Sequence, residues 1–266
     1  MSTDLIVGSP CIRRKEGGMA LVALEHHNKM AILRLNHGVT NAVSPALAME
    51  LSDLVRRVRS EYDGMLLAGG EKFFCIGFDV PKLLELDRSG MTELFHRYNQ
   101  ILLDLFTMPK PTACAVKGHC LGAGETFLLA CDYRYGAAGN TLFGLNEIKL
   151  GLPVPYLPDM LLREIVGDRI ASDMLYTGDF IGAIDAERVG ILHEVLPKET
   201  VEGRALEKLS ELCKRQSRAF AAVKANRVEV IRSRYEKKYE AKIEELLDCW
   251  YAETTQELLR EAAKKF

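Results

Sequence analysis

Short apolar segments with two different periods run along most of this chain. Apolar residues fill 20–24 and 30–35 on either side of a polar turn at 26–29, which predicts a β-hairpin. Apolar side chains recur at helical spacing over 45–60, which predicts an amphipathic helix. By the same two criteria we expect further strands at 65–68, 112–116, 132–135, 141–144 and 192–196, and helices at 94–106, 125–130, 157–165, 169–177 and 186–190.

The pattern changes character near residue 198, after which it is helical to the end. We therefore divide the chain into an irregular lead-in at 1–18, a mixed β and α region at 19–197 and a helical region at 198–266. A helical tail of this kind either caps its own domain or packs on a partner subunit.

Composition and charge narrow the class of protein. The chain has 266 residues, of which 48% are hydrophobic and 27% charged, as is typical of a globular protein with a sizeable core. A net charge of -2 argues against a nucleic-acid-binding protein. No apolar run approaches the ~20 residues of a membrane span, and the first 18 residues lack the ordered regions of a signal peptide. We expect no membrane association.

The cysteines indicate a reducing environment and no metal site. There are seven, and no pair has the C-x-x-C spacing of a zinc or redox site. Their flanks are apolar, so we interpret them as buried, reduced thiols and predict no metal site. Together these features predict a cytoplasmic protein.

Two glycine-containing turns, at 73–79 and 118–124, each follow a predicted buried strand. The second runs into a helix through Gly122, Ala123 and Gly124, which leaves backbone N–H groups unpaired at the helix start. The helix dipole adds positive potential there. Two such N–H groups from separate turns can bind one oxygen that gains negative charge during a reaction. A dinucleotide site is disfavoured, because the third glycine of G-x-G-x-x-G would fall at Phe127.

Several motifs in order along the chain resemble those of the crotonase superfamily of enoyl-CoA hydratases and isomerases. They are ILRLNHGVTNAVS at 32–44, FFCIGFD at 73–79, KPTACAVKG at 110–118, GAG at 122–124, CD at 131–132 and FGLNEIKLG at 143–151. The resemblance covers about residues 20–200. It implies an α/β fold, a spiral of ββα units with a C-terminal helical region. It also implies homotrimers, often paired into hexamers, with the C-terminal helices on a neighbouring subunit.

The resemblance also implies roles for particular residues. The family's oxyanion hole is two backbone N–H groups, which fall here on Phe78 and Ala123. The acyl-coenzyme A thioester is the substrate, and no tightly bound cofactor is implied. Its contacts are expected at Ala42, Ile76, Gly77, Asp79, Val80, Gly122 and Thr126.

The carboxylates divide the family by reaction. Hydratases carry two glutamates, and their positions fall here on Thr126 and Glu147, so only the second is present. One carboxylate suffices to take a proton from C2 of a 3-enoyl thioester and return it at C4. Hydratases also usually have proline where this chain has Asn146. The motif therefore resembles the Δ3,Δ2-enoyl-CoA isomerases, with Glu147 as the base.

Glu125 leaves an alternative open, because it lies one position before the missing glutamate. A one-residue step turns a side chain by ~100° around a helix. We interpret Glu125 as a first-turn acid favoured by the helix dipole. A turn one residue tighter or looser would instead bring it into the pocket as a second carboxylate. Hydration, decarboxylation and thioester hydrolysis then stay open, as does a non-catalytic acyl-CoA-binding scaffold.

Overall fold

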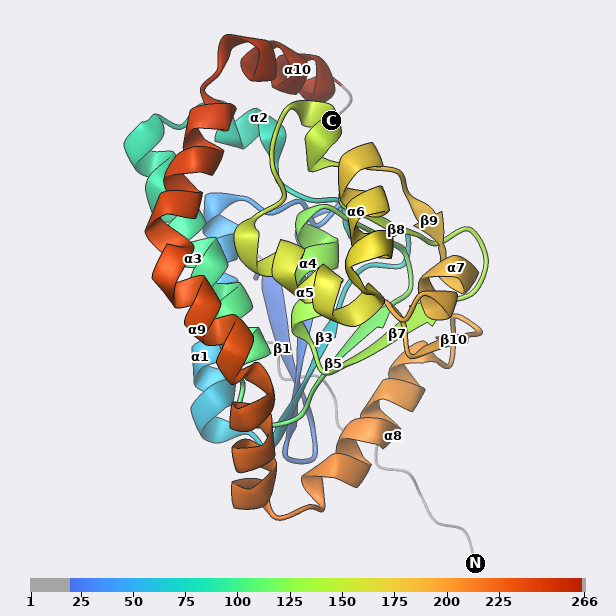
Figure 1. The fold of residues 1–266 in the computed structure, drawn as a ribbon. Helices are drawn as coiled ribbons and strands as arrows, with labels where there is room; N and C mark the ends of the chain where they lie inside the picture. The colour runs from blue at the N-terminus through green and yellow to red at the C-terminus, as the bar shows by residue number, and fades with distance from the viewer. Residues whose placement is uncertain (1–19, 265–266) are drawn as a thin grey trace, which may run out of the picture.

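Two sheets, one of six strands and one of four, form the centre of this computed structural model, which describes residues 20–264 (Figure 1). The strands are β1 (Val22–His27), β2 (Met30–Leu35), β3 (Gly64–Ala68), β4 (Phe73–Cys75), β5 (Thr112–Val116), β6 (His119–Leu121), β7 (Tyr133–Ala137), β8 (Leu142–Gly144), β9 (Ile181–Gly182) and β10 (Glu194–Leu196). The large sheet has the order β1-β2-β3-β5-β7-β10 and the small sheet the order β4-β6-β8-β9.

The helices join the strands in a repeated order. They are α1 (Pro45–Glu61), α2 (Val80–Leu83), α3 (Arg88–Phe106), α4 (Ala123–Ala130), the 3-10 helix η1 (Glu147–Leu150), α5 (Tyr156–Val166), α6 (Asp168–Thr177), α7 (Ala183–Arg188), α8 (Val201–Cys213), α9 (Ser217–Trp250) and α10 (Glu253–Ala263). The chain passes from the large sheet to the small sheet and then through helix, as in β3-β4-α3 and β5-β6-α4. Neighbouring units pair in parallel, β3 with β5 and β4 with β6. The predicted spiral of ββα units is confirmed.

The central strands are buried on both faces, which explains their continuous apolar sequences. Every residue of β3 and β5 is buried. On one face, α1 and α3 pack together over the main core. On the other, Val201, Ala205 and Leu209 of α8 pack against the sheet in a second cluster. The large sheet is thus enclosed between helical layers.

The C-terminal helices fold back over their own chain. Helix α9 runs along α3 and α5, and α10 lies across one end of the molecule over α2 and η1 (Figure 1). The hydroxyl of Thr255 in α10 donates to the carbonyl of Gly151 at 3.2 Å. Of the two alternatives for the tail, capping of its own domain is therefore observed. The trimerisation role assigned to 198–266 stays a prediction, and the lead-in at 1–18 lies outside the described residues.

Several element boundaries differ from the prediction. Helix α3 begins at Arg88, six positions before the predicted start at 94, because the Asp87 carboxylate caps it by accepting from the Gly90 N–H at 2.8 Å. Helix α4 begins at Ala123 and not at 125, and β6 lies inside the predicted turn at 118–124. The short elements α2, η1 and β9 were not predicted, because segments this short show no hydrophobic periodicity.

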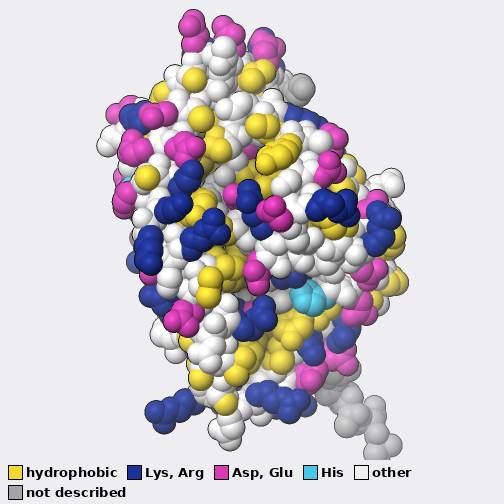
Figure 2. Space-filling view, in the orientation of Figure 1, with side chains coloured by type: hydrophobic (Ala, Val, Ile, Leu, Met, Phe, Trp, Pro, Cys, Tyr) yellow, Lys and Arg dark blue, Asp and Glu magenta, His cyan; other side chains and the backbone are white. Residues whose placement is uncertain are grey.

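The surface carries mixed charge. Figure 2 shows acidic and basic side chains interspersed over the face that α9, α5 and α8 share, with hydrophobic patches between them. Among the described residues no helix is long and apolar enough to cross a membrane.

Candidate active site

The two glycine turns identified in the sequence meet at one place in the fold. The first is held by Val43, whose N–H donates to the Gly77 carbonyl at 2.8 Å and whose carbonyl accepts from the Asp79 N–H at 3.0 Å. The second turns through Gly122, at φ +51°. A Cβ on Gly122 would lie 3.3 Å from the Gly77 Cα, so the two turns are in contact. Only glycine allows this approach at that backbone angle.

Each turn presents one backbone N–H at the contact. Ala123 is the first residue of α4, where an N–H has no partner within the helix. Phe78 follows Gly77, which has φ +110°. Within residues 20–264 neither the Phe78 nor the Ala123 N–H donates to another backbone group. The pair is thus available to a ligand oxygen, as an oxyanion hole requires.

Glu147 lies beside this pair. It opens η1, three residues after β8, and its Oε1 lies 3.7 Å from where a Cβ on Gly122 would stand. Its side chain is 8% exposed, and its Oε2 has no hydrogen-bond partner within the described part of the chain. Burial raises the pKa of the Glu147 carboxyl to about 7. A carboxyl with that pKa can both accept and return a proton near neutral pH.

A pocket of about 260 Å³ lies over these groups. Seven of the residues predicted for the site line it: Ile76, Gly77, Phe78, Val80, Gly122, Ala123 and Glu147. The structure therefore brings together the predicted base, both predicted N–H groups and most of the expected substrate contacts. What they do there stays a prediction.

The sequence interpretation missed the rest of the lining. These residues are Asn146, Leu150, Leu152, Trp250, Leu259 and Ala262. Three of them come from α9 and α10, beyond the region that the motifs cover. The one sequence feature that could have drawn attention to them is Trp250, the chain's single tryptophan. In the structure Trp250 is 1% exposed. They make the wall opposite the two turns largely apolar, as an acyl group requires.

Two predicted contacts lie beside the pocket and do not line it. The carbonyl of Ala42 is 2.8 Å from His37 Nδ1, and its chain neighbour Val43 holds the first turn. Asp79 caps α2 by accepting from the Lys82 N–H at 3.3 Å and pairs with the Lys82 ammonium. Both residues shape the turn that carries Phe78.

Thr126 also stands outside the pocket lining, although it occupies the position of the missing glutamate. It is fully buried in α4, and its hydroxyl bonds to the Tyr98 hydroxyl of α3 and donates to the Ala123 carbonyl at 2.8 Å. Tyr98 in turn packs against the ring of Phe78, with ring centres 4.8 Å apart. Thr126 therefore supports the second turn from behind.

Glu125 lies in the first turn of α4, as predicted, but it is not a solvated acid. Its side chain is 0% exposed, and neither carboxyl oxygen has a hydrogen-bond partner among residues 20–264. Burial, and to a smaller extent the charge of Glu147, raise the pKa of Glu125 to about 8. The residue does not line the pocket, yet it lies within electrostatic reach of Glu147.

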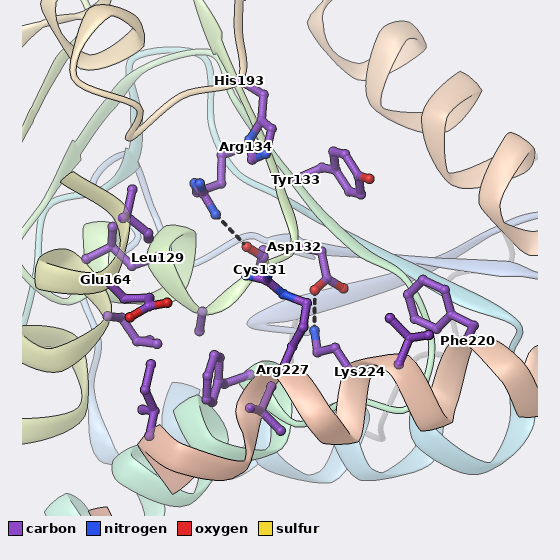
Figure 3. A pocket seen from close by; sticks show the side chains of 17 residues that line it. Leu129, Cys131, Asp132, Tyr133, Arg134, Glu164, His193, Phe220, Lys224 and Arg227 are labelled. Atoms are coloured by element: carbon purple, nitrogen blue, oxygen red, sulfur yellow. Dashed lines mark hydrogen bonds and ion pairs between the residues drawn. The ribbon is translucent and has the colours of Figure 1, made fainter. Parts of the chain in front are cut away.

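A second cavity, of about 410 Å³, lies between α4, β7, α5 and the start of α9 (Figure 3). Its buried charges are already satisfied. Asp132 pairs with Lys224, and Arg134 donates to the carbonyls of Cys131 and Ile191. His193 Nδ1 accepts from the Arg134 N–H at 3.2 Å. The pair of Asp132 with Lys224 ties α9 to the start of β7, and the other bonds satisfy the remaining buried groups of this cavity.

The structure thus combines, within residues 20–264, a ββα spiral with two free backbone N–H groups and a buried glutamate at one pocket, an arrangement suited to stabilising negative charge on a carbonyl oxygen. The sequence model of the enoyl-CoA hydratase/isomerase family matches residues 25–264. The chain belongs to that family, within the crotonase superfamily, and is an enzyme of it.

Similar proteins agree on the family and differ in reaction. Crotonyl-CoA hydratase of Syntrophomonas wolfei is 30% identical over 211 residues, which are 75% of this chain and 80% of that protein. The 2,3-dehydroadipyl-CoA hydratase of Escherichia coli is 29% identical over 209 residues, 77% of this chain and 81% of that protein. The crystal structure of human mitochondrial Δ3,Δ2-enoyl-CoA isomerase superposes with a TM-score of 0.88 at 22% identity, covering 92% of this chain and 98% of that one. At that identity the structure establishes the fold alone.

Proposed function

We propose that this enzyme is a Δ3,Δ2-enoyl-CoA isomerase with Glu147 as its single base. One observation carries the proposal. Glu147 is the only carboxyl among the described residues lining the pocket of the two N–H groups, whereas the position of a hydratase's other glutamate holds Thr126, bonded to Tyr98. A single carboxylate fits a reaction that moves one proton between two carbons and adds no water.

The proposed reaction starts from a 3-enoyl-CoA thioester. The Glu147 carboxylate takes a proton from C2, and the double-bond electrons shift so that negative charge reaches the thioester oxygen. The Phe78 and Ala123 N–H groups donate to that oxygen. The protonated Glu147 then delivers its proton to C4, the double bond now joins C2 and C3, and the carboxylate is restored. Coenzyme A enters and leaves as part of the substrate, and we propose no tightly bound cofactor.

The environment of Glu147 supports this cycle. The carboxyl must lose its proton to start and hold one in the middle, so a pKa of about 7 is well placed near neutral pH. The apolar walls formed by Leu150, Leu152 and Leu259 exclude water from the dienolate.

Replacing the base tests the proposal. We expect Glu147→Gln to lower the turnover of 3-hexenoyl-CoA by about 10²–10⁴-fold, because the amide cannot accept the proton. The matched control is Glu164→Gln, an exposed acid on α5 that borders the second cavity. Turnover by Glu147→Gln equal to that of the control would rule the isomerase out.

Hydration is the second candidate, and the names of the similar proteins favour it. It requires a second group to handle water, and Glu125 is a further carboxyl within electrostatic reach of Glu147. Addition of water to crotonyl-CoA that disappears in Glu125→Gln would establish the hydratase in place of the isomerase. Decarboxylation or thioester hydrolysis would appear as release of carbon dioxide or free coenzyme A. Binding of acyl-CoA without any turnover would instead indicate a scaffold.

We also propose that the chain associates with itself, as a homotrimer or a dimer of trimers. Large apolar side chains are exposed on neighbouring segments around β9, namely Ile148, Tyr176, Phe180 and Ile184. Clustered exposure of this kind marks interaction surfaces.

A further inference from the structure

Glu125 is a buried acid that the proposed reaction does not use. Its carboxyl is fully buried, its oxygens have no hydrogen-bond partner, and no cationic side chain pairs with it within residues 20–264. Burying an unpaired carboxylate costs several kcal/mol, and an apolar side chain at this position would avoid that cost. A buried acid without a partner is therefore expected where function requires it.

The groups facing Glu125 come from each element packed around the start of α4. Glu147 faces it from η1 and Cys120 from β6. The Gly144 N–H lies nearby on β8 and slightly favours the ionised form, although it makes no regular hydrogen bond. Cys75 of β4 lies within electrostatic reach of Cys120, and Tyr98 of α3 within reach of Glu147.

The charged groups of the remaining neighbour, α5, have other partners. Arg163 on that helix pairs with Asp159 and Asp168, and Glu164 is exposed. The titratable groups that act on Glu125 within residues 20–264 are thus Glu147 and Cys120, and of these Glu147 carries charge in the proposed reaction.

We propose that Glu125 is a positioning residue which holds a proton while Glu147 works as the base, and that loss of this proton switches the site off. The inference rests on the proposed function, since it assigns Glu147 the role of base. The proton on Glu125 stays in place throughout the catalytic cycle, so the stoichiometry of the reaction is unchanged.

The physical basis is the coupling of two acids in a dry pocket. With the pKa of Glu147 at about 7 and that of Glu125 at about 8, the pair carries one proton between those values. In that form we assign the proton to Glu125, because Glu125 is fully buried whereas Glu147 lines the pocket. Above about pH 8 Glu125 would also be ionised, two residues after Ala123 in α4 and within electrostatic reach of Glu147, and its charge would oppose the charge that develops on the dienolate.

The pH profile of kcat/KM tests this role. We expect kcat/KM of the wild type to rise with pH near pH 7 and to fall near pH 8. At pH 9 it should then be about 10-fold below its maximum. In Glu125→Gln the falling limb should vanish while the rising limb remains. Glu164→Gln should keep both limbs. A falling limb with the same midpoint in Glu125→Gln would overturn the proposal, because a merely structural residue would leave the shape unchanged.

A second measurement does not depend on which reaction is catalysed. The folded pKa of Glu125 is raised, so its contribution to stability is full below the unfolded value of about 4.5 and is lost as pH rises to about 8. The urea midpoint should therefore fall between pH 5.5 and pH 8.5 by more in the wild type than in Glu125→Gln. Equal falls would overturn the proposal.

The two measurements separate the possible failures. A wild type without turnover of 3-hexenoyl-CoA refutes the isomerase, and the profile is then recorded with the acyl-CoA that is turned over. If Glu125→Gln does not fold, Glu125→Met gives the same comparison, since it removes the titrating group and keeps a similar volume.

Discussion

Gly122 meets two demands at once, one of backbone angle and one of space. Its φ of +51° and ψ of -123° lie where side chains are strained, and an added Cβ would press on Gly77 at 3.3 Å. The same Cβ would stand 3.7 Å from the Glu147 oxygen, in the space that a substrate must enter.

We expect Gly122→Ala to lower kcat/KM by at least about 10²-fold, because the shift separates two donors that act on one oxygen. Gly139→Ala is the control, since Gly139 has φ +100° but meets no atom within 4 Å. Both variants should lose about 1–3 kcal/mol of stability from strain. Activity assays with matched urea melts separate the two effects, and equal activity losses would contradict the assignment.

The residues that line the pocket were predictable from the sequence where a motif fixes their position. Glu147, Phe78 and Ala123 each sit in a motif, and all three line one pocket. The direction of Glu125 was not predictable, because neighbouring helix positions differ by ~100° and the outcome depends on the start of α4. The sequence also gives no sign that Thr126 bonds to Tyr98, which lies 28 residues away.

At the scale of elements, α9 is fastened to the sheet by one ion pair. Lys224 lies about two turns after the first residue of α9 and pairs with Asp132 (Figure 3). Asp132 also accepts from the N–H and the hydroxyl of Thr112, each at 3.0 Å. The Lys224 side chain is 7% exposed and that of Asp132 20%. This pair ties α9 to the residue that precedes β7, and Trp250 is the last residue of the same helix.

We expect Lys224→Met to lower the free energy of unfolding by about 2–4 kcal/mol, because it leaves the Asp132 charge buried without its partner. Lys242→Met is the matched control, since its pair with Glu245 is exposed and should contribute no more than about 0.5 kcal/mol. Urea denaturation measures both. A loss for Lys224→Met no larger than for the control would show that the pair does not anchor the helix.

The longer elements were predictable because their period repeats, and the shorter ones were not. Helix α1 and strand β5 were predicted to within one residue, since burial imposes their apolar pattern. Helix α2 and η1 have four residues each. Their conformation depends on tertiary contacts, such as those of α10, which lie far away in sequence.

At the scale of the whole molecule, helix α10 folds back to form part of the pocket wall. Leu259 and Ala262 of α10 line the pocket, so the described chain supplies a wall to its own site. Self-association is therefore not needed for that wall, and the exposed apolar side chains around β9 stay available for the self-association that we propose.

We expect the protein to sediment as a trimer or hexamer, and Ile184→Asp to shift it toward smaller species by charging an exposed apolar contact. Val39→Asp, at an exposed apolar site away from β9, should leave the assembly unchanged. Analytical ultracentrifugation distinguishes these results. A monomeric wild type would refute the assembly and would leave the pocket's closure by α10 unaffected.

The chain's single tryptophan has a practical consequence. Trp250 is buried in the pocket wall where α9 ends and α10 begins, and no other indole contributes to the signal. Its fluorescence therefore reports on this one location, without a label. A ligand entering the pocket, or a displacement of α10, should change the emission. Titration with acyl-CoA can therefore measure binding, and stopped-flow mixing can time each event, in the unmodified protein.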